Sequence, residues 1–212
     1  ECIISKKKVH GFIKRCCWAV GLEDDHGPML ADVLVAADYR GHYSHGLKNL
    51  DKYLSDVTNR FVAKKGVPRI VKQTQATALV DGNNLLGPVV GNYCMDLAIE
   101  KAKQSGIGWV SVSGSNHFGM ASWYGIRAVD KGFIGMAFTN TGAGMAPTRA
   151  IQNALGTKPI CIAAPAKDGD SFVLDMATTT VAFGKVRLFH LMLFKMFKDI
   201  IHILNSKTYL FC

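Results

Sequence analysis

The spacing of the apolar residues changes once along this chain, at the sequence KKGVP (64–68). Before it, apolar residues recur every three or four positions over 4–20, 27–41 and 44–57, which predicts three amphipathic helices. After it, short runs rich in β-branched residues alternate with helical patterns. An α/β fold accommodates both halves, with an N-terminal helical unit followed by a mixed sheet that helices cover.

The second half predicts more elements in shorter segments. Two strands joined by a turn are expected at 69–83 and a helix at 87–106, followed by a strand, a helix and three strands at 107–112, 119–131, 133–140, 159–166 and 172–177. We therefore divide the chain into a helical unit (1–68), a mixed-sheet unit (69–186) and an atypical tail (187–212).

The tail is apolar nearly all round. A membrane-spanning helix needs about 20 apolar residues, and Lys195, Lys198 and Asp199 interrupt this run. We predict a buried or interfacial helix there and no membrane span.

The composition restricts the partners and the compartment. The chain has 25 basic and 16 acidic residues, a formal charge of +9, but the basic residues are dispersed apart from Lys6, Lys7 and Lys8. A small anionic substrate explains this balance, and nucleic-acid binding is not expected. The six cysteines form no C-x-x-C pair and no signal-peptide pattern is present, so we expect a cytoplasmic protein with reduced thiols. Because the first residue is glutamate, the N-terminus is expected to be incomplete.

Two histidines lie in glycine-rich segments where the helical and strand patterns stop: His45 in GHYSHG and His117 in SNHFG. Small neighbours let a ligand approach the backbone, and an imidazole titrates near neutral pH, so each is a candidate general acid or base. The alternative for each is a structural histidine held by a hydrogen bond. His42 and His45 have H-x-x-H spacing, but no third ligand follows at a suitable distance, so no metal site is predicted.

Two further segments could contact a ligand. The loop in MAFTNTGAG offers backbone N–H groups that could hold a phosphate or carboxamide, although an ordinary loop has the same composition. Asp175 ends an apolar strand in LDMATTT and could instead cap a helix. No G-x-G-x-x-G sequence follows a predicted strand, so a Rossmann fold is not expected.

Six motifs occur in a characteristic order: ADYRGHYSHGLKNLDKYL, VDGNNLLGPVVG, GIGWVSVSGSNHFGMASWYG, GMAFTNT, ALGTKPICIAAPA and FVLDMAT. Over residues 9–186 the chain resembles the type-2 malate/L-lactate dehydrogenase family, which includes ureidoglycolate, sulfolactate and diketogulonate oxidoreductases. The resemblance implies hydride transfer between a nicotinamide cofactor, NAD or NADP, and a 2-hydroxy or 2-oxo acid such as malate or lactate. It also implies a non-Rossmann cofactor-binding domain like that of L-sulfolactate dehydrogenase, a homodimer with its site near the subunit boundary, and no metal.

The resemblance assigns roles to individual residues. In the family, the histidines of S-H-G and N-H-F-G are alternative proton donors or acceptors; they match His45, which we rank slightly first, and His117. It implies Ser44, Lys48 and Asn116 as substrate contacts, with Asn116 also orienting His117, and Thr141, Asp175, Met176 and Ala177 as cofactor contacts. Asp175 is alternatively a hydrogen-bond partner of a catalytic imidazole.

The sequence departs from the family at three places. Asn49 stands where the family commonly has an arginine, and the adjacent Lys48 lacks the planar fork that grips a carboxylate, so weaker substrate binding is expected. Lys158 replaces the asparagine of the usual G-T-N-P and could favour a 2′-phosphate. After Val186 the resemblance ends, so we expect a C-terminally truncated chain with an aberrant tail. The alternative to an enzyme is a non-catalytic product that acts by association with other chains.

Overall fold

The computed structural model describes residues 3–179. Its helices are α1 (Lys6–Ala19), α2 (His26–Tyr39), α3 (Leu50–Thr58), α4 (Gly87–Ser105) and α5 (Ser122–Val129), with short 3-10 turns η1 (Tyr43–His45), η2 (Leu47–Asn49) and η3 (Lys167–Gly169). Its strands are β1 (Arg69–Gln73), β2 (Thr77–Asp81), β3 (Trp109–Ser113), β4 (Gly135–Phe138), β5 (Ile160–Pro165) and β6 (Ser171–Met176). The predicted tail lies outside the described residues.

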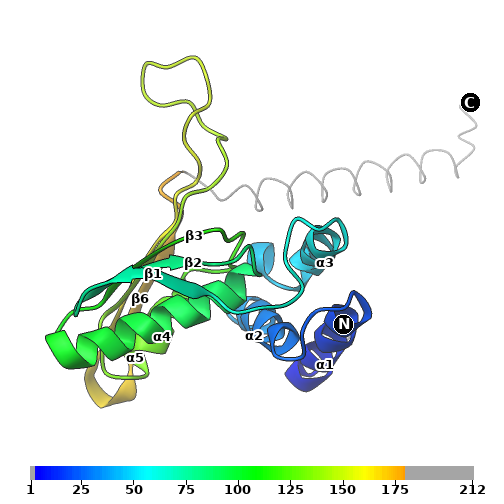
Figure 1. Ribbon diagram of the computed structural model, residues 1–212, viewed down its shortest axis with the longest axis horizontal. Helices are drawn as coiled ribbons and strands as arrows, with labels where there is room; N and C mark the ends of the chain where they lie inside the picture. The colour runs from blue at the N-terminus through cyan, green and yellow to red at the C-terminus, as the bar shows by residue number, and fades with distance from the viewer. Residues whose placement is uncertain (1–2, 180–212) are drawn as a thin grey trace, which may run out of the picture.

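The strands form two three-stranded sheets, with orders β1-β2-β3 and β4-β5-β6. In the first sheet β1 is antiparallel to β2, and β3 is parallel to β2 because α4 provides the crossover between them. In the second sheet all neighbours are antiparallel. Figure 1 shows α4 running along the first sheet, with α1, α2 and α3 gathered at one end. The predicted mixed α/β fold is confirmed.

The third predicted helix is wrong in its first part. The segment 44–57 was expected to be one helix, but η1 and η2 precede α3, which begins only at Leu50. Gly46 has an extended backbone, and the N–H of Leu47 donates to Oδ2 of Asp38 at 2.8 Å instead of to a helical carbonyl. A Cβ at Gly46 would overlap the Asp38 carboxylate, so only glycine fits there. Ser44 and His45 therefore lie on an irregular loop held against α2.

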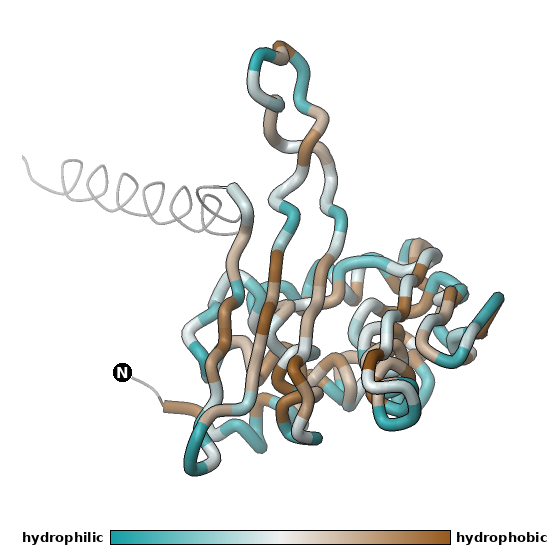
Figure 2. The backbone as a smooth tube through the Cα atoms, turned by 90° about the vertical axis from the view of Figure 1, so that its left-hand side faces the viewer, coloured by the Kyte–Doolittle hydropathy of each residue, from teal (hydrophilic) through white to brown (hydrophobic). Residues whose placement is uncertain are grey.

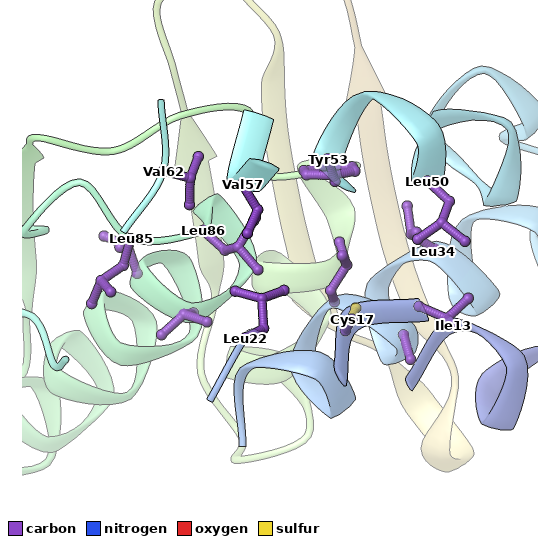
Figure 3. Close-up of a cluster of buried hydrophobic side chains, with 14 of the residues drawn as sticks. Ile13, Cys17, Leu22, Leu34, Leu50, Tyr53, Val57, Val62, Leu85 and Leu86 are labelled. Carbon is purple, nitrogen blue, oxygen red and sulfur yellow. The ribbon is translucent and has the colours of Figure 1, made fainter. Parts of the chain in front are cut away.

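One buried apolar cluster joins the helices to the first sheet. Figure 3 shows part of it, including Ile13 of α1, Leu34 of α2, Val57 of α3 and Leu86 just before α4. Ile13, Leu34, Val57 and Leu86 have no exposed surface, and burial of such side chains contributes roughly 1.5–3 kcal/mol each. The cluster crosses residue 68, the predicted limit of the helical unit. The loop that carries His45 is thus positioned by the same core that positions α4.

The second sheet continues into a long connection. Figures 1 and 2 show the chain between β4 and β5 extending away from the rest of the molecule, and Figure 2 shows apolar residues concentrated along the strands. Within residues 3–179, no helix combines the length and apolar character that crossing a bilayer requires. Cys16, Cys17, Cys94 and Cys161 are free thiols.

Candidate active site

A large open cleft of about 2280 Å³ lies between the start of α3, one side of α4, β3 and β4, and the end of β6. Every site residue expected from the sequence lines it: Ser44, His45, Lys48, Asn116, His117, Thr141, Asp175, Met176 and Ala177. These residues come from four separate segments. The fold brings them to one cavity.

The two candidate histidines are neighbours. Their rings stack with centroids 5.6 Å apart and planes inclined by 20°. Oγ of the buried Ser44 lies 2.9 Å from Nδ1 of His45, so the hydroxyl fixes the orientation of this imidazole. Because a charge on either ring repels a charge on the other, the pair takes up one proton more readily than two.

Two groups contact Nδ1 of His117. The hydroxyl oxygen of Tyr53 lies 2.5 Å from this nitrogen, and the N–H of Gly119 donates to it at 3.3 Å. Because an amide N–H can only donate, Nδ1 is an acceptor, and the proton of the neutral ring is on Nε2. Tyr53 therefore donates as well. His117 is held as a hydrogen-bond donor through Nε2.

Tyr53 was not predicted as a site residue. Its helical spacing with Leu47, Leu50 and Leu54 is typical of an apolar helix face, and the ring is buried in the core of Figure 3. Burial also raises the pKa of its hydroxyl, which remains protonated. The available signal was its polar tip, since a buried tyrosine hydroxyl usually has a hydrogen-bond partner.

The pKa of His117 is lowered from 6.5 to about 4. The main cause is removal of water from the imidazole by the surrounding protein, and repulsion from His45 and Lys52 adds to it. The residue nevertheless keeps exposed surface along the cleft, so a ligand can reach it. At neutral pH His117 is a neutral donor rather than an acid.

We expect this shift to be visible by NMR. The Cε1–H signal of His117, identified by its loss in a His117→Asn variant, should titrate well below pH 6.5. Between pH 6.5 and about 4 the unfolded chain binds more protons at this position than the folded chain. The stability that this group contributes is therefore present above this window and is lost as the pH falls through it. A midpoint near 6.5 would contradict the assignment.

The loop that carries His117 is anchored to the start of α4. Oδ1 of Asn116 accepts from the N–H of Gly87 at 2.9 Å, and Nδ2 donates to the carbonyl of Leu85 at 2.8 Å. The amide of Asn116 thus holds the backbone and orients His117 only through the loop. Gly119 has a φ of +85°, and a Cβ there would also overlap Val33 of α2. Glycine is therefore needed here for the loop to pack against α2.

The predicted cofactor contacts lie at another wall of the cleft. Oδ2 of Asp175 accepts from the N–H of Ser122 at 2.7 Å and so satisfies a donor at the start of α5. The carboxylate thus caps a helix and does not bond an imidazole. The hydroxyl oxygens of Thr141 and Thr157 lie 3.3 Å apart, and a Cβ at Gly156 would overlap Thr141.

Asn49, Lys48 and Lys52 follow His45 closely in the sequence and differ in their hydrogen bonds. Nδ2 of Asn49 donates to the carbonyl of Ser44 at 2.7 Å, so this amide stabilises the loop. Lys48 and Lys52 both line the cleft and are exposed. Neither lysine side chain has an ion pair or hydrogen bond with another residue of 3–179.

One group of potential metal ligands occurs within the described range, formed by Glu23, Asp25 and His26 away from the cleft. Nε2 of His26 lies 3.1 Å from the carbonyl oxygen of Gly66. A carbonyl can only accept, so this nitrogen carries a proton and has no lone pair for a metal. Oε2 of Glu23 accepts from the N–H of Gly66 at 2.9 Å, so Glu23 and His26 both connect the start of α2 to Gly66.

These features define the class of protein: a mixed α/β protein whose cleft combines two stacked imidazoles with cationic side chains. The chain belongs to the malate/L-lactate dehydrogenase family, whose family model matches residues 4–192. The predicted family is thereby confirmed.

The relatives agree in sequence and in fold. Malate dehydrogenase of Pyrococcus horikoshii is 40% identical over 186 residues, which are 88% of this chain and 51% of the relative. Malate/(S)-sulfolactate dehydrogenase of Methanothermus fervidus is 39% identical, over 87% and 54%. The solved structure of malate dehydrogenase from Entamoeba histolytica has a TM-score of 0.86 at 33% identity, over 89% and 53%. The chain spans about half the length of the relatives it matches.

Proposed function

We propose that this chain carries the site of an NAD(P)-dependent oxidoreductase acting on a 2-hydroxy or 2-oxo acid such as malate or lactate. The observation that supports this most is the stacking of His45 and His117 in a cleft bordered by Lys48 and Lys52. Hydroxyacid oxidation moves one proton and requires a site for a carboxylate, and these residue types supply both. Relatives named malate and sulfolactate dehydrogenases support the same class.

The two imidazoles have different tasks in this proposal. His117 donates a hydrogen bond from Nε2 to the substrate oxygen, because Tyr53 and Gly119 occupy Nδ1. His45 transfers the proton to or from that oxygen, while Ser44 holds its ring. Since His117 stays neutral, a proton on His45 meets no second positive imidazole.

The far wall of the cleft fits a nicotinamide dinucleotide. Thr141, Thr157 and Thr178 supply hydroxyls for ribose or phosphate oxygens, and Met176 supplies an apolar contact. A side chain at Gly142 would meet no atom within 4 Å, so a ligand can approach its backbone. When bound, the nicotinamide supplies or accepts the hydride. NAD and NADP are both included in this proposal.

The proposal extends to the surroundings of the enzyme. We place it in the cytoplasm as a homodimer with a small acid as its substrate and without nucleic acid. The four described free thiols and the dispersed basic residues support a reducing compartment and a small anionic ligand.

Titration with NADH and NADPH tests the function. We expect saturable binding and cofactor oxidation when oxaloacetate, pyruvate or a sulfonated 2-oxo acid is added. Binding to the folded chain should raise its stability by about 2.7 kcal/mol at a ligand concentration 100 times Kd. A folded chain that binds neither cofactor and oxidises neither would overturn the proposal and favour the non-catalytic alternative.

A further inference from the structure

The start of α3 carries a lysine, Lys52, into the cleft of the two histidines. The family resemblance did not indicate this residue. Lys52 precedes Tyr53, whose hydroxyl contacts His117, and it lines the same cleft as His45. Two cations on the surrounding helices are already paired: Arg127 with Asp96, and Lys103 with Glu100. Within residues 3–179, the side chain of Lys52 has neither an ion pair nor a hydrogen bond. Its charge is available to a ligand.

The other candidates for binding a carboxylate are less suitable. Asn49 uses its amide to hold the carbonyl of Ser44, so turning it toward a substrate would release the loop that carries His45. Lys48 lines the cleft as well, but the charge of Lys52, and not that of Lys48, contributes to lowering the pKa of His117. Asp51 also borders the cleft, and no ion pair joins it to Lys52.

We propose that Lys52 binds the carboxylate of the acid substrate and places its oxidisable carbon beside His45 and His117. This inference rests on the proposed function and adds the residue that selects for acids. A lysine is a compact charge without the fork of an arginine, so it fixes where the carboxylate lies but not how the rest of the acid is rotated about it. We therefore expect the site to accept 2-oxo acids with different side chains.

The test compares lysine variants in the intact chain. Lys52→Gln should raise the KM for oxaloacetate or pyruvate by about 10- to 100-fold, because a charge-assisted contact is lost. The Kd for NADH should stay within about twofold, and Lys52→Arg should restore most of the affinity for the acid. Lys72→Gln removes an exposed charge of β1 outside the cleft and should leave both values unchanged. Lys48→Gln should have a smaller effect than Lys52→Gln.

A second measurement does not depend on turnover. In the parent protein, oxamate should shift the NMR signal of His117, and this response should be lost in Lys52→Gln. In the same variant the pKa of His117 should be higher than in the parent, because the repulsion from the charge of Lys52 is removed. An unchanged KM with intact NADH binding, a larger effect of Lys48→Gln, or no oxamate response in the parent overturns the role of Lys52. Loss of NADH binding in the parent overturns the proposed function instead.

Discussion

Replacement of His45 by asparagine is expected to lower kcat by about 10²- to 10⁴-fold, the usual contribution of a positioned acid or base. Asparagine can still bond to Ser44, which lies 2.9 Å from Nδ1 of the histidine, but it cannot take up or release a proton. The affinity for NADH should remain within about threefold of the parent value. Steady-state rates with oxaloacetate and a fluorescence titration measure the two effects.

His117→Asn is the matched comparison. Its amide oxygen can still accept from Tyr53 in place of Nδ1, whereas the donor at the Nε2 position and the ring stacking on His45 are lost. We expect a smaller loss of kcat than in His45→Asn. The reverse order would move the proton-transfer role to His117 and contradict the neutral form assigned to it.

The second large effect concerns the packing beneath the site. A Cβ at Gly87 would overlap the carbonyl oxygen of His117, a backbone atom that cannot move without displacing the loop. Gly87→Ala should therefore destabilise the protein by roughly 1–3 kcal/mol. The melting temperature should fall by about 2–4 °C for each kcal/mol. The displaced His117 should also lower kcat.

Gly11→Ala is the control for this substitution. Gly11 lies within α1, and a Cβ there would make only an ordinary contact with the side chain of Arg15 at 3.6 Å. Alanine should stabilise the helix by about 0.5–1 kcal/mol. Equal melting temperatures for Gly87→Ala and the parent would show that the 116–118 loop yields easily, and would contradict its role as a rigid support.

The helices and strands were largely predictable because their signals are local. The positions of α1, α2, α4 and the six strands follow from apolar spacing and from glycine or proline at their ends. The segment 44–49 was not predictable in this way. Its apolar spacing is helical, but Asp38 of another helix accepts the N–H of Leu47 and interrupts the helix. A tertiary hydrogen bond overrode the local pattern.

The candidate site shows the same division. The sequence pattern identified His45 and His117 as separate candidates, and the family resemblance assigned both to one site. Neither the pattern nor the resemblance indicated Tyr53 or Lys52 as site residues. Asn116 and Asp175 were recognised as important, yet their side chains bond to the backbone of neighbouring elements. Such partners lie tens of residues away in the chain. No spacing rule connects them.

Residue order alone was sufficient for the α/β class and the family, since these depend on short-range periodicity and on motifs in a set order. The contact between the two imidazoles, the tautomer of His117 and its low pKa arise only after folding. Each depends on how much water and which distant groups surround one ring, and packing of the whole chain sets both.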